Sequence, residues 1–428
     1  MARKSRNWLI VVAGAAVLGT MLSALILTNA VPQPMRVAEP LLSVPAVRSD
    51  EFRHLQSAML GSAATPGNRI EIYQNGEEIY PAMLEAINSA AHTITFETYE
   101  YWGEEIGRAF AEALARAAER GVAVHAIFDY LGSVQASREK FSRMEEAGVE
   151  VVRWRKPSWY QLARFNHRTH RKLLVVDGTV GFTGGANVAD PWQGHPDEGG
   201  YRDNHYRMEG PAVAHLQNAF MQNWLNARNQ LLHDKEYFPL PEEAGELGIK
   251  IVNSSPREGT HRIRLMILLA IAGARDNIRL GTAYFYPDDM IMDALLEARE
   301  RGVSVDILLP SAVHYSTAVR EASKNRWGKL LAAGVRIHEY QPAMYHAKLY
   351  IVDDYWISIG SANLDNRSFR LNDETNAILM NHELAATLVS QFERDLEQTE
   401  TYDLDRWGER PWTLRLLGWL TMTVGWHL

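Results

Sequence analysis

The sequence predicts an α/β protein built from two copies of one domain and preceded by a transmembrane helix. Three observations support this interpretation. Predicted strands and helices alternate along the chain, a motif near position 170 recurs near position 346, and residues 8–27 carry no charge. Alternating strands and helices are typical of α/β domains with a layered sheet. With 428 residues, 46 % of them hydrophobic, the chain is long enough for two or three domains.

The composition excludes several classes of protein. A formal net charge of −8 gives no general basic field, so nucleic acid is not an expected partner. The chain has no cysteine, which rules out disulfides, a thiol nucleophile and thiolate-bound metals.

Residues 1–34 are predicted to form a short cytoplasmic tip and a transmembrane anchor. The uncharged run 8–27 is about long enough to cross a bilayer once, and Arg3, Lys4 and Arg6 precede it. The length of this run predicts one crossing of the membrane. The positive-inside rule then predicts that the N-terminus lies in the cytoplasm and the folded part on the other side. A signal peptide cleaved after Ala30 and a buried helix of a soluble protein remain alternatives.

The remaining elements follow in order. Residues 35–65 are predicted to be a linker and residues 66–235 the first domain. This domain has strands at 93–101, 122–130 and 172–178 and a helix from 106 to 117, whose apolar residues fall on one face. Residues 236–248 contain two prolines and four glutamates and are predicted to link this domain to the second, residues 249–400.

An internal repeat relates the two predicted domains. Both copies read His-x-Lys-x4-Asp, and an asparagine follows each lysine by fifteen residues. Residues 119–130 match 300–311, and residues 147–154 match 333–340. The repeated positions are His170, Lys172, Asp177 and Asn187 in the first half and His346, Lys348, Asp353 and Asn363 in the second. Average composition gives a chance of about one in twenty that a residue matches at any one fixed position. Several matches at the same spacing in both halves are therefore far beyond coincidence and indicate a duplicated domain.

Two other interpretations of these positions are open. Histidine, lysine and asparagine could simply cap strands and turns. Alternatively, His167-x-x-His170 could be half of a metal site, although no carboxylate pattern surrounds it and the second half lacks a counterpart of His167.

At these residues the sequence resembles the phospholipase D superfamily, over about residues 66–400. Within that superfamily it is similar to the bacterial cardiolipin synthases. The resemblance rests on "FETYEYWGEEIGRAFAEAL", "DYLGS" and "YRDNHYRMEGPAV" in the first half, and on "YFYPDD", "EYQPAMYHAKLYIVDD" and "GSANLDNRSFRLNDE" in the second. It implies two pseudo-symmetric phospholipase D-like α/β/α sandwich domains that share one active site.

The resemblance also implies a reaction. The enzyme would move a phosphatidyl group from one phosphatidylglycerol to another, yielding cardiolipin and glycerol. His170 would attack phosphorus to form a phosphatidyl-histidine, and His346 would protonate the departing glycerol. The phosphoryl oxygens would be held by Lys172, Lys348, Asn187 and Asn363, so no metal or cofactor is expected. One imidazole must then be charged and the other neutral, which predicts a coupled titration near neutral pH.

Four acids are expected to support this site. Asp203 and Glu374 are candidates to orient the histidines, or else ordinary surface acids. Asp177 and Asp353 lie at strand ends and are expected to brace the fold.

Two further segments point to a membrane. Residues 151–176 contain seven bases and no acid, interleaved with aromatic residues, which suits an anionic lipid surface or a nucleic acid. In the predicted membrane-associated segment 401–428, Trp412, Trp419 and Trp426 lie seven apart on one helical face. A helix packed on the protein's own core is the alternative there.

The expected partners are therefore phosphatidylglycerol and an anionic phospholipid membrane, with no nucleic acid and the number of assembled copies left open. The expected location is the bacterial cytoplasmic membrane, with the catalytic domains on its periplasmic face. The alternative functions are a phospholipase D that hydrolyses phosphatidyl lipids or exchanges their head groups, a nuclease of the same fold, and an inactive lipid-binding protein.

Overall fold

The computed structural model describes residues 43–157, 166–256, 261–311 and 317–422, together with Gly14, Val17, Gly19 and Thr20. Nearly all of the predicted anchor, residues 8–27, lies outside these residues. Within the described part of the chain, no helix has both the length and the apolar character needed to span a bilayer.

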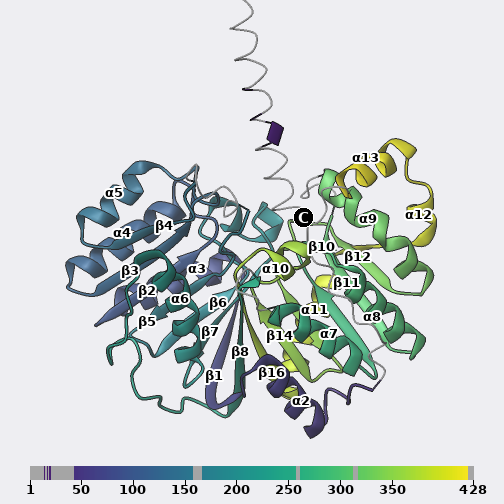
Figure 1. Cartoon of the computed structure of the whole chain (residues 1–428), viewed down its shortest axis with the longest axis horizontal. Helices are drawn as coiled ribbons and strands as arrows, with labels where there is room; N and C mark the ends of the chain where they lie inside the picture. Colours follow the sequence, from purple (N-terminus) through teal and green to yellow (C-terminus); the bar gives the residue numbers. More distant parts are fainter. Residues whose placement is uncertain are drawn as a thin grey trace, which may run out of the picture.

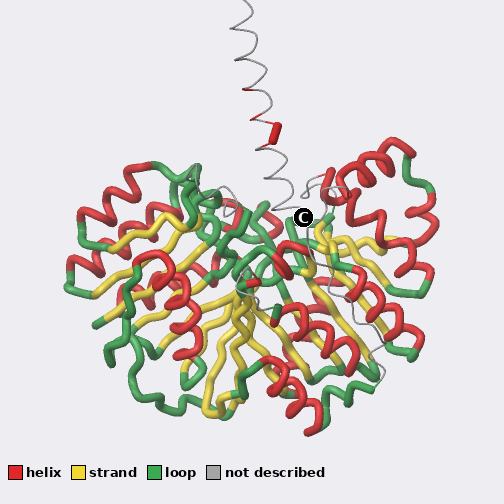
Figure 2. The backbone as a smooth tube through the Cα atoms, in the orientation of Figure 1, coloured by secondary structure: helices red, strands yellow, loops and turns green. Residues whose placement is uncertain are grey.

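A mixed sheet of fifteen strands forms the centre of the molecule, and helices pack on both of its faces (Figures 1 and 2). The elements of the first half are β1 (Thr65–Gln74), α3 (Asn75–Ser89), β2 (Thr93–Thr98), α4 (Ile106–Glu119), β3 (Ala123–Asp129), α5 (Arg138–Glu146), β4 (Glu150–Trp154), β5 (Leu173–Val176), β6 (Val180–Gly184), β7 (Asn204–Glu209) and α6 (Val213–Arg228). Two short 3-10 turns, Asp190–Trp192 and Pro196–Glu198, precede β7.

The second half repeats this order with additions. Its elements are β8 (Leu247–Ser254), α7 (Arg262–Gly273), β9 (Asn277–Gly281), β10 (Phe285–Tyr286), α8 (Asp289–Glu300), β11 (Ser304–Pro310), α9 (Thr317–Ala332), β12 (Arg336–Tyr340), β13 (Leu349–Val352), β14 (Trp356–Gly360), β15 (Leu364–Asp365), α10 (Asn366–Arg370), β16 (Glu374–Met380), α11 (His382–Leu396), β17 (Thr399–Tyr402), α12 (Leu404–Gly408) and α13 (Trp412–Met422).

The strand order repeats outward from the middle of the sheet. From β1 the order is β1-β7-β6-β5-β2-β3-β4, and from β8 it is β8-β16-β14-β13-β9-β11-β12, with β17 added at the edge. β1 and β8 pair antiparallel only near their starts, where Thr65 faces Ile249 and Asn68 faces Leu247. The predicted α/β class is confirmed, and the repeat in sequence is also a repeat in topology.

The hydrophobic core crosses the junction between the halves. One buried cluster contains Leu173 and Val175 of β5, residues of α6 and α11, and Leu349 and Ile351 of β13. Because strands of both halves contribute to one cluster, separating the halves would expose apolar surface on each.

Asp177 and Asp353 occupy equivalent turns after β5 and β13. Both have a positive φ, 51° and 53°. The Asp177 carboxylate accepts hydrogen bonds from the backbone N–H groups of residues 91, 92 and 93, at 2.7–2.9 Å. Asp353 does the same for residues 275, 276 and 277, at 2.8–3.1 Å. Each aspartate thus ties the start of one strand to the end of another.

The predicted linker 35–65 contains a helix, α2 (Asp50–Leu60). Ser49 caps its start by accepting a hydrogen bond from Phe52 N, 3.1 Å away. Phe52, Gln56 and Leu60 are buried on one face, because a spacing of four residues places them on one side of a helix. Phe52 and Leu60 belong to the core cluster of the second half.

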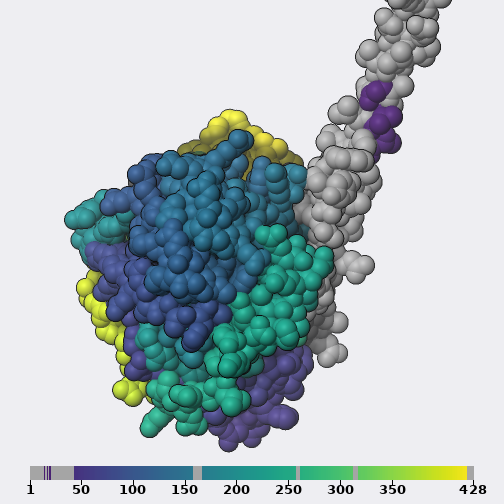
Figure 3. Space-filling model, turned by 90° about the vertical axis from the view of Figure 1, so that its left-hand side faces the viewer, coloured from purple at the N-terminus to yellow at the C-terminus, as the bar shows by residue number. Residues whose placement is uncertain are grey.

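The C-terminal segment packs on α9 through one side and exposes the other. Gly418 lies so close to α9 that a Cβ there would be 2.5 Å from the backbone oxygen of Glu321. On the outer side, Trp412 is 73 % exposed and Trp419 59 %. The C-terminal helices lie at the top of the molecule in two perpendicular views (Figures 1 and 3). Trp426 lies outside the described residues.

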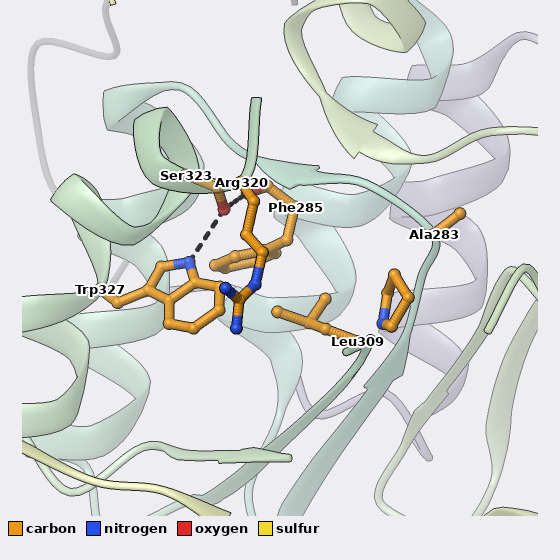
Figure 4. Close-up of a pocket in the computed structure, with 7 residues that line it drawn as sticks. Ala283, Phe285, Leu309, Arg320, Ser323 and Trp327 are labelled. Carbon is orange, nitrogen blue, oxygen red and sulfur yellow. Dashed lines mark hydrogen bonds between the residues drawn. The ribbon is translucent and has the colours of Figure 1, made fainter. Parts of the chain in front are cut away.

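A small cavity of about 10 Å³ lies between α9 and β11 (Figure 4). Beside it, Trp327 Nε1 donates to Ser323 Oγ at 2.9 Å, and Ser323 in turn donates to the backbone oxygen of Phe285. A space of this size holds about one water molecule. It is therefore too small for a substrate.

Candidate active site

Two backbone crossings between the halves build the site. His170 N donates to the backbone oxygen of Asp373, and Asp373 N donates to that of Arg168, both at 2.9 Å. The equivalent crossing joins the segment before β13 to Arg202. His346 N donates to Arg202 O at 2.7 Å, and Arg202 N donates to Met344 O at 2.9 Å. Each histidine therefore lies beside the residue that directly precedes the acid of the other half.

The crossings pair each histidine with a carboxylate across the halves. His170 Nδ1 is 3.0 and 3.1 Å from the two carboxylate oxygens of Glu374, and His346 Nδ1 is 2.7 Å from Asp203 Oδ2. A carboxylate can only accept, so Nδ1 of each ring carries the proton. Nε2 is then left with its lone pair, which is the form needed in a nucleophile or general base.

Both carboxylates are fully buried and are held by further donors. Glu374 accepts hydrogen bonds from Ser361 Oγ at 2.5 Å and Ser368 Oγ at 2.8 Å. Asp203 accepts from Trp192 Nε1 and from the backbone N–H of Asn204, both at 2.8 Å. These donors leave each carboxylate little freedom to turn away from its histidine.

A glycine makes room for Asp203. A Cβ on Gly185 would be 2.1 Å from Asp203 Oδ1, whereas the equivalent position in the second half is Ser361, which donates to Glu374. The shorter acid thus faces a glycine and the longer acid faces a serine. Sequence reasoning missed Trp192, Ser361 and Ser368. The two serines lie within the segment "GSANLDNRS". Their closeness in sequence to Asn363 could have indicated that they belong to the site.

The two lysines of the repeat are buried next to the histidines. Lys172 Nζ donates to the backbone oxygen of His170 at 2.8 Å. Lys348 Nζ is 2.9 Å from His346 Nδ1 and 3.1 Å from His346 Nε2, and it donates to the His346 backbone oxygen. Because Nδ1 carries the ring proton, Nε2 is the ring atom that can accept from this lysine. Burial lowers the pKa of Lys172 to about 8 and that of Lys348 to about 7, although nearby carboxylates oppose the shift. Both lysines therefore titrate much closer to neutral pH than an exposed lysine.

The pKa values of the two histidines and of their two carboxylates are all lowered from their usual values. Burial lowers the pKa of His170 to about 4 and that of His346 to about 3, because the carboxylates only partly offset burial and the lysines add to it. Burial alone would raise the pKa of Glu374, but His170 and Lys172 lower it to about 2. The pKa of Asp203 is likewise held well below its usual range, because His346 and Lys348 outweigh its burial. The lowered pKa values favour the neutral form of both imidazoles, whereas the sequence analysis predicted one neutral and one charged ring.

The two asparagines have equivalent places beside the histidine motifs. Asn187 Oδ1 accepts from Glu100 N at 3.1 Å, and Asn363 N donates to Ser368 Oγ at 3.1 Å. In the described part of the chain, neither side-chain NH₂ group donates a hydrogen bond to protein. Both amides therefore keep donors for a ligand.

Aromatic rings pack against the imidazoles. Tyr99 lies edge-on to His170 with ring centroids 5.4 Å apart, and Trp192 lies edge-on to His346 at 5.0 Å. Such contacts restrict ring rotation and lower the local polarity, which adds to the burial of the histidines.

The other predicted features have structural surroundings. His167 Nδ1 is 3.2 Å from the backbone oxygen of Leu371. No three histidine or acidic side chains of the described ranges are grouped as a metal site would require. In the basic run 151–176, Arg168 and Arg171 are buried, with Arg168 paired to Asp129 at 3.3 Å. Residues 158–165 lie outside the described residues.

Comparison with known proteins agrees with the sequence resemblance. The model of the family described as "Cardiolipin synthase, PLD-like domain" matches residues 83–224 and 267–396. The chain is 35 % identical over 357 residues to the major cardiolipin synthase ClsA of Bacillus subtilis (strain 168), covering 82 % of this chain and 74 % of that protein. It is 33 % identical over 356 residues to cardiolipin synthase 1 of Staphylococcus epidermidis (strain ATCC 12228 / FDA PCI 1200), covering 82 % and 72 %.

A solved structure has the same fold. The crystal structure of phosphatidylserine synthase from Haemophilus influenzae Rd KW20 superimposes with a TM-score of 0.67, covering 88 % of this chain and 100 % of that one. At 12 % identity this likeness concerns the fold alone. The family match and the two relatives go further, and the chain belongs to the cardiolipin synthase family of phospholipase D-like proteins.

Proposed function

We propose that this protein is a cardiolipin synthase, which transfers a phosphatidyl group from one phosphatidylglycerol to a second and releases glycerol. The observation that carries the proposal is the pair of histidine–carboxylate contacts, each built across the two halves, with Lys172 and Lys348 beside them. The relatives that cover most of the chain are named for this activity.

In the first step, His170 Nε2 attacks phosphorus and the bond to the glycerol oxygen breaks. His346 donates the proton that the departing glycerol needs. His346 is neutral before substrate binds, so it must first take up a proton from water at Nε2. The anionic phosphodiester favours this protonation because it brings negative charge beside the ring.

In the second step, the terminal hydroxyl of the second phosphatidylglycerol gives its proton to His346 and attacks phosphorus. The phosphorus–nitrogen bond breaks, and its electron pair returns to His170. Lys172, Lys348, Asn187 and Asn363 hold the non-bridging oxygens throughout. Asp203 and Glu374 keep Nδ1 of each ring protonated, so Nε2 faces the phosphorus.

Assigning the attack to His170 follows the family resemblance, because the geometry of the two halves is nearly equivalent. Rapid acid quenching followed by peptide mass spectrometry locates the covalent phosphorus. A phosphatidyl adduct on His346 would reverse the two roles.

We also propose that the enzyme works at the bacterial cytoplasmic membrane. A single N-terminal anchor, residues 1–34, would hold domains 66–235 and 249–400 on the periplasmic face. The outward side of α13 supports this, since Trp412 and Trp419 are exposed and tryptophan favours the headgroup zone. A protease added to intact spheroplasts should degrade the large domain, and full protection would contradict this topology.

Lipid mass spectrometry tests the proposed reaction. Purified protein is mixed with vesicles of phosphatidylglycerol, alongside His170→Ala, His346→Ala and the matched control His54→Ala, whose side chain is exposed on α2. Cardiolipin and free glycerol should form with the wild type and the control, and with neither site variant. Phosphatidic acid without cardiolipin would instead identify water as the acceptor and a phospholipase D as the function.

A further inference from the structure

The near symmetry of the site is broken at Glu100 and Tyr284. Thr98 Oγ1 donates to the backbone oxygen of Glu100 at 3.1 Å, and Thr282 Oγ1 donates to that of Tyr284 at 3.0 Å. The residue after each pairs in parallel with the residue after an active-site asparagine: Tyr101 with Val188, and Phe285 with Leu364. Glu100 and Tyr284 are therefore equivalent positions, one in each half.

The backbone of Glu100 is fixed to the site. Its N–H donates to Asn187 Oδ1 at 3.1 Å, and its carbonyl accepts from Val188 N at 3.2 Å. The preceding residue, Tyr99, packs on His170. The backbone that carries the Glu100 side chain is therefore held in place by Asn187, one of the proposed phosphate-binding residues, and by its neighbour Val188.

Glu100 lies at the partly exposed edge of the proposed phosphate site, because its backbone N–H is bound to Asn187 Oδ1. Glu100 and Tyr284 are partly exposed, whereas the histidines and lysines of the motifs are buried. Burial raises the pKa of Glu100, while the positive charges of Lys172 and Lys348 act to lower it. In the described part of the chain, no ion pair joins Glu100 to either lysine. The Glu100 side chain accepts a hydrogen bond from Trp102 Nε1, 3.3 Å from Oε2.

An acid in this position is costly for an enzyme that binds anionic lipids. Its charge repels the phosphodiester, unless the carboxylate also makes a favourable contact with the bound lipid. The part of phosphatidylglycerol next to the phosphate is glycerol, whose hydroxyl groups donate hydrogen bonds that a carboxylate accepts well. A cationic head group would be opposed by the two lysines. The Tyr284 hydroxyl can both donate and accept, which suits a second hydroxyl of glycerol.

We propose that Glu100 and Tyr284 form a subsite for the glycerol head group, which positions its hydroxyls and selects glycerol over simple alcohols. This inference rests on the proposed cardiolipin synthase function. The same subsite serves both steps, because the departing glycerol and the incoming glycerol take the same place opposite His170. Glu100 acts here as a specificity residue, and the histidines perform the chemistry.

Competition between two alcohols tests the subsite. Vesicles of phosphatidylglycerol are incubated with isotope-labelled glycerol and 1-propanol at equal concentration, and the ratio of labelled phosphatidylglycerol to phosphatidylpropanol is measured by mass spectrometry. The proteins are the wild type, Glu100→Leu, Glu100→Gln, and the control Glu105→Leu, an exposed acid on the same connection.

Loss of a hydrogen bond to a charged acceptor corresponds to about a tenfold change. We therefore expect the glycerol-to-propanol ratio to fall about tenfold in Glu100→Leu. In Glu100→Gln it should fall less, because the amide oxygen still accepts, and in Glu105→Leu it should not change. A change in folding alone lowers both products together and leaves the ratio unaltered.

An unchanged ratio in an active Glu100→Leu or Glu100→Gln protein would overturn this inference and leave the proposed function intact. A wild type that transfers phosphatidyl groups to neither alcohol nor to phosphatidylglycerol would overturn the proposed function, and the subsite with it.

Discussion

Replacing Asp203 by asparagine tests whether this acid controls the protonation of His346. In the structure Asp203 Oδ2 lies 2.7 Å from His346 Nδ1 and also accepts from Trp192, while Oδ1 accepts from Asn204 N. An asparagine must place its NH₂ group against one of these donors. At the Oδ1 position this group would face the fixed Asn204 N–H, and at the Oδ2 position it would face the fixed Trp192 Nε1–H as well as His346. In the second arrangement the ring proton of His346 must move from Nδ1 to Nε2, and in both arrangements a donor loses its acceptor.

The expected cost can be estimated from that one contact. A hydrogen bond to a charged group contributes about 1.5–3 kcal/mol, or a factor of about 10–150 in rate. Asp203 also raises the pKa of His346, so its removal lowers the protonated fraction of that ring further. We therefore expect kcat for cardiolipin formation to fall about 10²–10³-fold, with a smaller change in KM, because the acid does not contact substrate.

The assay is the rate of cardiolipin formation from phosphatidylglycerol vesicles between pH 5 and 9. The control is Asp197→Asn, which changes an exposed acid outside the site. Thermal unfolding of each variant distinguishes a folded protein with slow chemistry from an unfolded one. A folded Asp203→Asn protein with kcat within a factor of three of wild type would refute the proposed role of this carboxylate.

Three further predictions concern stability, pH and membrane binding. Asp177→Ala should lower the free energy of unfolding by about 2–4 kcal/mol in urea titrations, because three backbone N–H groups lose their acceptor; a change below 0.5 kcal/mol would contradict the bracing role. The lowered pKa of Glu374, about 2 when folded, means that its stabilising effect is complete above about pH 5 and is lost as the pH falls toward 2. Glu374→Gln should therefore flatten the dependence of stability on pH in that range, and a curve parallel to wild type would count against the shift. Replacing Trp412 and Trp419 together by alanine should weaken binding of the detergent-purified protein to anionic vesicles in flotation assays at least fivefold without changing its unfolding temperature, whereas unchanged flotation would show that α13 does not contact lipid.

The alternation of predicted strands and helices was enough to predict the α/β class, and the repeat singled out the histidine, lysine and asparagine positions. The strand at 172–178 was predicted because its residues are almost wholly apolar, and β5 is indeed buried along its whole length. β6, with the sequence VGFTG, was not predicted, since its two glycines weaken the local signal for a strand.

The cross-half contacts could not be predicted from periodicity or spacing. Nothing in the sequence says that His170 reaches Glu374, 204 positions away, rather than Asp203 in its own half. That choice depends on how β1 and β8 meet and on the two backbone crossings, which are long-range features. The neutral state of both imidazoles likewise depends on burial beside Tyr99 and Trp192, which only the folded chain reveals.

The exchange of acids between the halves has a consequence for the history of the chain. A single half would hold a histidine without its carboxylate, so a one-copy ancestor could have assembled this site only by pairing two identical chains. In such a pair every substitution occurs twice, and the two acids must be the same residue. In a single chain the two copies can differ, so one half can carry aspartate beside glycine and the other glutamate beside serine, as Asp203 with Gly185 and Glu374 with Ser361 do. Holding both copies in one chain would thus allow the two histidines to take the different roles that we propose for them, nucleophile and acid.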